Sequence, residues 1–275
     1  FDVTSPSAVL YVEGNNSITL NNTKLTDTNT SLNGNSETYK NIFLYQSMSG
    51  DADDGNSSFT AKDSTITTNK GDTIFVTNTT ATIDLTNNTI SNNDNTGAFI
   101  RIQSGKWGNS GSNGGDVTLN AENQVIDGDI YVDNISTLFM IMSNESRYSG
   151  TINGDNTAKT LLLKLDSNST LTLTGDSYVT SLENEVSDNS NINFNGHTLY
   201  VNGTALTQSS PENSANENDN SEEVTNNKVS IGQTIPTEKI NDGEVSTNVL
   251  LIVGLAFAVI VIFIIIIIIR AKKKK

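Results

Sequence analysis

Short clusters of β-branched and aromatic residues recur along the first 206 residues of the chain, about 30 residues apart. In the first three repeats, a further apolar residue (Leu25, Ile66 or Ile90) comes seven positions after the apolar residue of a second cluster. A fixed internal order at such a period is typical of a solenoid. The first clusters begin at Ala8, Asn41, Thr73, Ala98 and Asp129, and the second clusters at Ser17, Ser58, Thr82 and Asp116.

Three short strands per repeat, separated by Asn, Ser and Asp turns, predict an all-β fold, a parallel β-helix with one coil per repeat. We expect Ile, Val, Leu and Phe to form inward columns and Asn to form ladders at the bends. A β-sandwich is the alternative, because it also has many short strands, but it does not explain the repeat. Later strands are expected at 138–142, 161–165, 171–173, 178–179, 192–194 and 199–201, and the last coil should close near Leu206.

The clearest targeting signal is Val249–Ile269, 21 consecutive residues without a charge or a strongly polar group. As a helix this stretch would be about 31 Å long, which matches the hydrocarbon core of a bilayer. Arg270 and four lysines follow it, which indicates a cytoplasmic C-terminus. We therefore predict a single transmembrane helix at 248–270, a cytoplasmic lysine tail at 271–275, and an ectodomain outside the cell membrane.

The segment between the repeats and this apolar stretch, residues 207–247, is polar, acidic and poor in aromatic residues, which predicts a disordered tether. A flexible chain of that length has a root-mean-square reach of about 35 Å. The ectodomain should therefore comprise residues 1–206. Because the chain starts at Phe1 without a signal sequence, we expect it to be the C-terminal part of a longer exported product.

The composition excludes several classes of function. The formal net charge is −15, and removing the five cations after the apolar stretch leaves −15 − 5 = −20 outside, so nucleic acid is not an expected partner. The chain has no cysteine, which excludes a disulfide scaffold, and a single histidine, His197. Catalytic triads and zinc sites of the usual composition cannot be built from this set.

One acidic loop is a candidate metal site. Asp51, Asp53 and Asp54 lie close together within the stretch 49–56, and oxygen-rich loops suit Ca²⁺. The spacing does not follow the EF-hand order, and the twelfth position from Asp51 is Lys62 where that motif needs Glu. We therefore keep Ca²⁺ as a possible cofactor beside a solvated turn as the alternative, and we expect no other cofactor.

A glycine-rich insertion at 104–116 is the candidate carbohydrate-binding site. It contains the only tryptophan of the chain, and sugars bind by stacking on an aromatic face with amide and carboxylate hydrogen bonds around it. A tryptophan that folds back over apolar coil edges is the alternative. The candidate binding residues are Arg101, Lys106, Trp107, Asn109, Asn113 and Asp116.

Catalysis is the weaker expectation. Solenoid polysaccharide lyases need a carboxylate-bound Ca²⁺ and a basic residue that accepts the proton. Arg101, on an expected strand near Lys106, is the only arginine in a suitable place. Without a matching acidic column in neighbouring coils, one arginine does not define a lyase site.

Several strings carry a resemblance to a known family: residues 41–52, 106–119, 150–155 and 193–203. They resemble the C-terminal half of exported "carbohydrate-binding domain-containing" proteins of clostridia and related gut anaerobes. The resemblance covers residues 1–206 and excludes the transmembrane end. It implies a right-handed parallel β-helix, similar in fold to pectate lyases, that binds acidic or cellulosic polysaccharide, but it carries over no defined binding residue.

Together these observations predict a cell-surface, membrane-anchored protein that binds polysaccharide or a host or cell-surface glycan, or acts as an adhesin, without catalysis. One alternative is a Ca²⁺-dependent enzyme of the polysaccharide lyase type. The other is a structural stalk that displays an N-terminal domain and has no affinity for glycans.

Overall fold

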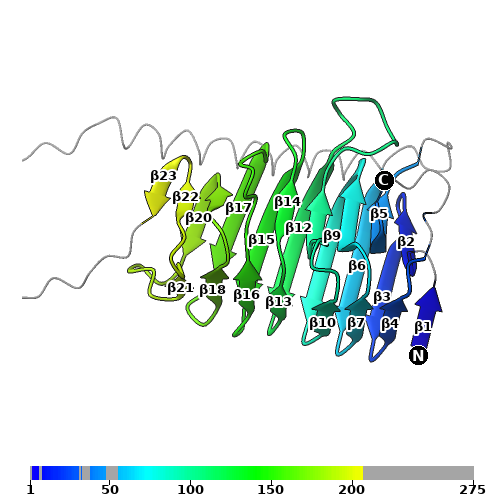
Figure 1. Cartoon of the computed structure of the whole chain (residues 1–275), viewed down its shortest axis with the longest axis horizontal. Helices are drawn as coiled ribbons and strands as arrows, with labels where there is room; N and C mark the ends of the chain where they lie inside the picture. The colour runs from blue at the N-terminus through cyan, green and yellow to red at the C-terminus, as the bar shows by residue number, and fades with distance from the viewer. Residues whose placement is uncertain (1, 6–7, 31, 33–37, 48–54, 207–275) are drawn as a thin grey trace, which may run out of the picture. The chain divides into compact units, whose positions relative to one another are not determined.

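The computed structural model describes residues 2–5, 8–30, 32, 38–47 and 55–206. These residues form 23 strands and no helix, and the strands follow one another in coils stacked along one axis (Figure 1). Each regular coil contributes one strand to each of three walls, so the predicted order of three strands per repeat is confirmed.

Sheets B and E make the first wall. Sheet B contains β2 (Leu10–Glu13), β5 (Lys40–Tyr45), β8 (Asp72–Thr77), β11 (Ile100–Ile102) and β14 (Ile130–Val132). Sheet E contains β19 (Ser177–Val179), β22 (Leu199–Val201) and β23 (Thr204–Leu206). Ile152 joins the two sheets: it forms a parallel bridge with Ile130, and its carbonyl accepts a hydrogen bond from the Tyr178 N–H at 2.9 Å.

Sheet C makes the second wall without interruption. Its strands are β3 (Ser17–Asn21), β6 (Asn56–Lys62), β9 (Thr79–Thr86), β12 (Gly115–Glu122), β15 (Thr137–Ser143), β17 (Thr160–Leu165) and β20 (Ser181–Asn184). Every pairing in this sheet is parallel, which excludes the sandwich alternative, because the sheets of a sandwich are antiparallel.

Sheets A and D make the third wall. Sheet A contains β1 (Asp2–Ser5), β4 (Lys24–Asp27), β7 (Thr65–Thr68) and β10 (Thr89–Asn92). Sheet D contains β13 (Val125–Asp127), β16 (Arg147–Gly150), β18 (Thr170–Leu173) and β21 (Ile192–Asn193). No ladder hydrogen bond joins β10 to β13 within the described residues, so this wall is divided between two consecutive coils.

The core consists of inward columns in register. Leu25, Ile66 and Ile90 are direct partners on β4, β7 and β10, as the seven-residue spacing predicts. Phe59 lies between Ile18 and Ile83 in the neighbouring column of sheet C, and it has no exposed surface. Burial of such columns between stacked coils is the main source of stability in a solenoid.

The bends between sheet C and the third wall use left-handed backbone conformations. Asn22, Asp63, Asn87 and Asn123 occupy the same place in successive coils, with φ between 46° and 52°. Asn and Asp tolerate this region better than other residues with a side chain, which explains the Asn-rich turns. The prediction that Asn recurs at the bends is therefore confirmed.

A buried polar ladder lies one residue further along each of these bends. The backbone N–H of Thr23 donates to Ser64 Oγ at 3.1 Å, and that of Ser64 to Asn88 Oδ1 at 3.0 Å. The N–H of Asn88 donates to Gln124 Oε1 at 2.9 Å, and that of Gln124 to Ser146 Oγ at 3.1 Å. Each side chain satisfies a backbone donor of the preceding coil, which a buried bend requires.

The final coil differs from the expectation. β23 pairs with β22 in antiparallel orientation, so the described solenoid ends in a hairpin instead of one more parallel strand. The turn is Asn202-Gly203, with φ of 48° and 77°. Positive φ at both positions is typical of a two-residue hairpin turn, and Asn-Gly is its common sequence.

In the described part of the chain there is no helix that could span a membrane. The predicted tether at 207–247, the transmembrane helix at 248–270 and the lysine tail at 271–275 lie outside the described residues. They stay predictions.

Candidate functional site

Aromatic side chains gather on the outer face of sheet B. The outward residue of each strand follows one column in register from coil to coil: Tyr11, Phe43, Phe75, Arg101 and Tyr131. Neither Phe43 nor Phe75 belongs to the core cluster inside the solenoid, although both are buried. We call this set the aromatic column.

Ring contacts hold the first part of the column together. Phe43 lies parallel to Tyr45 at 4.2 Å between ring centroids, and it contacts Tyr11 edge-on at 5.9 Å and Phe75 at 5.7 Å. The Lys40 ammonium lies 4.6 Å from the Phe43 ring centroid and 5.2 Å from that of Phe75. These geometries are favourable aromatic and cation–π contacts, so the rings form one rigid surface.

Tyr45 continues this surface towards the bend into sheet C. Its hydroxyl donates a hydrogen bond to Glu13 Oε2 at 3.0 Å. Burial, followed by the hydrogen bond and the charge of Glu13, raises the pKa of Tyr45 to about 12. The phenol is therefore neutral at physiological pH and presents a hydrogen-bonding edge beside its apolar ring.

Trp107 joins the same surface from the glycine-rich loop. Its ring centroid lies 6.1 Å from that of Tyr45 with the planes 39° apart, and the residue is half-buried. The loop starts in the coil of β11, whereas Tyr45 belongs to the coil of β5. The loop therefore folds back along the solenoid, and both expectations for this residue are met in part, because it covers a coil edge and keeps exposed surface.

Asn113 closes the loop. Its side-chain amide donates to the carbonyls of Gly105 at 2.8 Å and of Trp107 at 2.9 Å. Its backbone carbonyl accepts a hydrogen bond from the Asn78 N–H at 3.0 Å. Asn113 is buried, and through these hydrogen bonds it positions the backbone of Trp107.

The remaining loop candidates do not converge on Trp107. Lys106 and Asn109 are exposed, and the carbonyl of Asn109 accepts two hydrogen bonds from Ser112. Asp116 lies on β12 in sheet C, a different wall, where it accepts a hydrogen bond from Thr137 at 2.7 Å. The structure therefore brings Trp107 to Tyr45 and leaves Asp116 on another face.

Arg101 is committed to structural contacts. Its Nε lies 2.8 Å from Asp72 Oδ2, and its Nη2 lies 3.3 Å from Asp72 Oδ1. The guanidinium also lies over the Tyr131 ring, 4.3 Å from the centroid. A guanidinium paired on one side and stacked on the other is poorly placed to accept a proton from a substrate.

The same wall carries a second pair of rings further along. Tyr178 and Tyr200 are partners on β19 and β22, and their rings stack in parallel at 4.8 Å. Ile152 links sheet E to sheet B, so this pair continues the face that carries the aromatic column.

Asp133 fixes the start of the loop. Its carboxylate accepts hydrogen bonds from the Ser104 N–H at 2.7 Å, the Ile135 N–H at 3.2 Å and the Ser136 hydroxyl. Burial alone would raise the pKa of Asp133, but these hydrogen bonds together lower it.

We expect Asp133→Asn to lower the unfolding free energy at pH 7 by about 1–2 kcal/mol, because two amide donors lose a charged acceptor. Because the pKa of Asp133 is lowered in the folded state, its carboxylate stabilises the fold at pH values above the unfolded-state pKa of about 3.9. This stabilisation is lost as the pH falls through the folded-state pKa. Urea midpoints of wild type and variant should therefore differ at pH 7 and converge in acid. An equal difference at both pH values would contradict this account.

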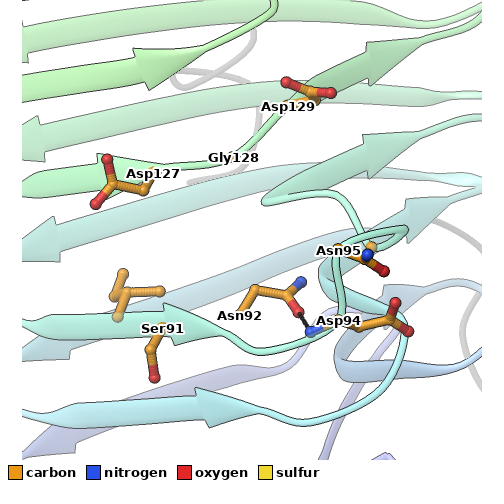
Figure 2. Close-up of a pocket in the computed structure, with 9 residues that line it drawn as sticks. Ser91, Asn92, Asp94, Asn95, Asp127, Gly128 and Asp129 are labelled. Carbon is orange, nitrogen blue, oxygen red and sulfur yellow. Dashed lines mark hydrogen bonds between the residues drawn. The ribbon is translucent and has the colours of Figure 1, made fainter. Parts of the chain in front are cut away.

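A shallow cavity of about 420 Å³ opens where the third wall is divided (Figure 2). Ile90, Ser91 and Asn92 of β10 line one side, and Asp127, Gly128 and Asp129 line the other. Asp94, Asn95 and Gly97 of the connection between β10 and β11 complete it. We call this the wall pocket.

The predicted Ca²⁺ ligands Asp51, Asp53 and Asp54 lie outside the described residues, so that site stays a prediction. Within residues 55–206 and the shorter described ranges before them, no group of three or more His, Asp and Glu side chains could hold a metal ion.

The aromatic column is the feature that the sequence analysis missed. Its signal was the ring at the centre of three of the five first clusters, Phe43, Phe75 and Tyr131, with Tyr11 at the fourth position of the first cluster. The low overall aromatic content of 6% hid this concentration on one face.

The fold and this face define a class, a parallel β-solenoid with an aromatic outer wall. Comparison of the chain with protein-family models, with curated proteins and with solved structures finds no match.

Proposed function

We propose that the chain is a cell-surface protein that binds carbohydrate or acts as an adhesin, without catalysis. The observation that supports this most is the contact between Trp107 and Tyr45 on the outer wall, where two half-buried rings meet. Aromatic faces beside polar edges suit the C–H faces and hydroxyls of sugars.

The two alternatives have less support. A lyase needs a free base, and Arg101 is bound to Asp72 and stacked on Tyr131. A stalk that only displays another domain has no need for an outward column of rings, since a solvated sheet face is usually Thr-, Ser- and charge-rich, as the outer face of sheet C largely is.

The finer features of the fold and its location belong to the same proposal. A right-handed coil is expected, because parallel strands joined by a crossover are almost always right-handed. The strings at 41–52, 106–119, 150–155 and 193–203 support a relation to exported carbohydrate-binding β-helix proteins. The apolar stretch Val249–Ile269 supports a single membrane anchor, with the solenoid outside and the C-terminus in the cytoplasm.

The test is binding of the full chain, in detergent, to a panel of neutral and acidic polysaccharides with and without Ca²⁺. We expect saturable binding that Trp107→Ala weakens about tenfold or more, equivalent to about 1.4 kcal/mol. Trp107→Phe should retain part of the affinity, because a ring is kept. Phe139→Ala is the matched control, since Phe139 is a half-buried outward ring on β15 in sheet C.

Absence of binding to every glycan would remove carbohydrate binding and leave the stalk or a protein adhesin. Release of unsaturated uronate from pectate in the presence of Ca²⁺ would instead support the lyase. Binding that Trp107→Ala and Phe139→Ala weaken equally would show that the site is not at the aromatic column.

A further inference from the structure

The wall pocket exists because two consecutive coils do not pair. Among the described strands, β10 is hydrogen-bonded only to β7, and β13 only to β16. At the bend just before β13, the side chain of Gln124 takes the place of a ladder hydrogen bond between the two coils. Its amide donates to the carbonyls of Asn88 at 2.9 Å and Val125 at 2.8 Å. The long side chain lies between the coils, and the strands beyond it, β10 and β13, lie near each other without ladder hydrogen bonds.

Backbone groups face the pocket as a result. In a parallel sheet, successive residues of a strand direct their N–H and C=O groups alternately towards the strand on one side and the strand on the other. Thr89 and Asn93 donate towards the coil of β7, and Gly128 donates towards Ser149 in β16. Ile90, Asn92 and Asp127 therefore direct their backbone groups across the gap, where no described strand is hydrogen-bonded to them. Such groups are free to hydrogen-bond to a polar ligand.

The side of the pocket that is formed by the connection between β10 and β11 is rigid. Asp94 accepts hydrogen bonds from the Gly71 N–H at 2.8 Å and the Thr96 N–H at 2.9 Å, while the Asn92 amide donates to the Gly71 carbonyl at 2.9 Å. Gly97 approaches the Gly71 carbonyl so closely that a Cβ would collide with it. The connection is thus clamped to the preceding coil, and the pocket has a fixed shape.

Two polar side chains of the pocket are not used by the fold. Asp127 is exposed and Asn95 is exposed, and neither forms a hydrogen bond with another described residue (Figure 2). Asp129 uses one oxygen to accept from the Thr151 N–H at 2.8 Å. With the apolar side chain of Ile90 beside them, these groups offer acceptors, an amide and a small apolar surface, the set that a sugar ring requires.

Charge limits the ligand further. Among the described residues that line the pocket there are three carboxylates, those of Asp94, Asp127 and Asp129, and no lysine or arginine. A uronate, sulfate or phosphate group would therefore be repelled, whereas neutral hydroxyl groups can donate to the carboxylates. The cavity volume of about 420 Å³ fits a group of monosaccharide size.

The pocket adjoins the aromatic column. Asp129 lies two residues before Tyr131, and its charge and hydrogen bond contribute, after burial, to the raised pKa of Tyr131. A ligand on the Tyr131 ring is thus within one sugar residue of the pocket. Coils in a parallel sheet are about 4.8 Å apart, close to the length of one sugar in an extended chain. A polymer can therefore run along the outer face of this wall, where Trp107, Tyr45 and Tyr131 keep exposed surface.

We propose that the wall pocket binds a neutral sugar branch of a polysaccharide whose backbone lies on the outer face of the first wall, over the half-buried rings of Trp107, Tyr45 and Tyr131. This inference rests on the proposed function, because it needs a backbone held by Trp107 and Tyr45. It assigns to Asp127 and Asn95 the recognition of the branch.

The test compares three probes of equal backbone length on the full chain by calorimetry: an unbranched β-1,4-glucan, a xylose-branched β-1,4-glucan, and a glucuronate-branched β-1,4-xylan. We expect the xylose-branched probe to bind at least tenfold more tightly than the unbranched one, and the glucuronate-branched probe to gain nothing. Asp127→Asn and Asn95→Ala should each reduce the preference for the branch at least fivefold. Asp188→Asn, an exposed carboxylate in the turn before β21, is the matched control.

The outcomes separate the two proposals. Trp107-dependent binding with no preference for the neutral branch, or a preference that the pocket variants leave unchanged, would overturn the branch pocket and keep the proposed function. Tighter binding of the glucuronate-branched probe would overturn the charge argument. No binding of any probe or panel glycan would remove both.

Discussion

Replacing Asn88 with leucine should lower the free energy of unfolding of the solenoid by about 4 kcal/mol or more. The Asn88 side chain accepts from the Ser64 N–H and donates to the Ala61 carbonyl at 2.8 Å and to Gln124 Oε1 at 3.0 Å. Leucine has a similar volume but satisfies none of these groups. Each buried polar group left without a partner costs about 1–3 kcal/mol.

The measurement is the urea midpoint of unfolding, monitored by the circular dichroism signal of β structure at about 218 nm. The matched control is Asn93→Ala, because Asn93 is exposed and, among the described residues, its side chain donates only to Asn69 Oδ1 at 2.8 Å. The control should change the unfolding free energy by less than about 1 kcal/mol. Equal effects of the two variants would show that the buried ladder does not stabilise the coils.

Truncation of Phe59 to alanine should have a comparable effect, a loss of about 3–5 kcal/mol, because it leaves a cavity at the centre of the core. Phe59 is fully buried and lies between Ile18 and Ile83 in register. Strands on both sides are held by ladder hydrogen bonds, so the coils cannot collapse into the space.

Phe139→Ala is the matched control for this variant as well. Phe139 is the same residue type on the same sheet, but it points outward from β15 and is half-buried. Its loss should cost about 1 kcal/mol. If chemical denaturation gave the two alanine variants the same midpoint, the assignment of Phe59 to the core and Phe139 to the surface would be wrong.

Much of the fold could be predicted from the sequence, because one coil per repeat imposes a strict pattern. Leu25, Ile66 and Ile90 recur at the same offset, and in the structure they are direct partners. The Asn and Asp residues of the turns were also informative, since few other residues adopt a positive φ at low cost. The parallel pairing follows from these two signals.

The division of the third wall could not be predicted. The sequence gives Gln124 no special status, because in isolation it is one more polar residue at a bend. Its effect depends on the hydrogen bonds that its amide makes to Asn88 and Val125 in three dimensions. The hairpin at the end of the solenoid was predictable in principle, since Asn202-Gly203 is a known turn sequence.

The candidate site was predicted in part. Trp107 was identified as the aromatic residue of the loop, but its partner Tyr45 comes from a coil more than 60 residues earlier. Only the folded loop brings these two rings together. Asp116 was grouped with Trp107 by proximity along the chain, although the start of a new strand places it on another wall.

The contact between Trp107 and Tyr45 also gives the molecule an optical probe of its own. The chain has one tryptophan, so all indole emission comes from the edge of the aromatic column. Tyr45, 6.1 Å away between ring centroids, is close enough to transfer its excitation to that indole. Occupation of the column and opening of the coils that carry it can therefore be followed by fluorescence without any added label.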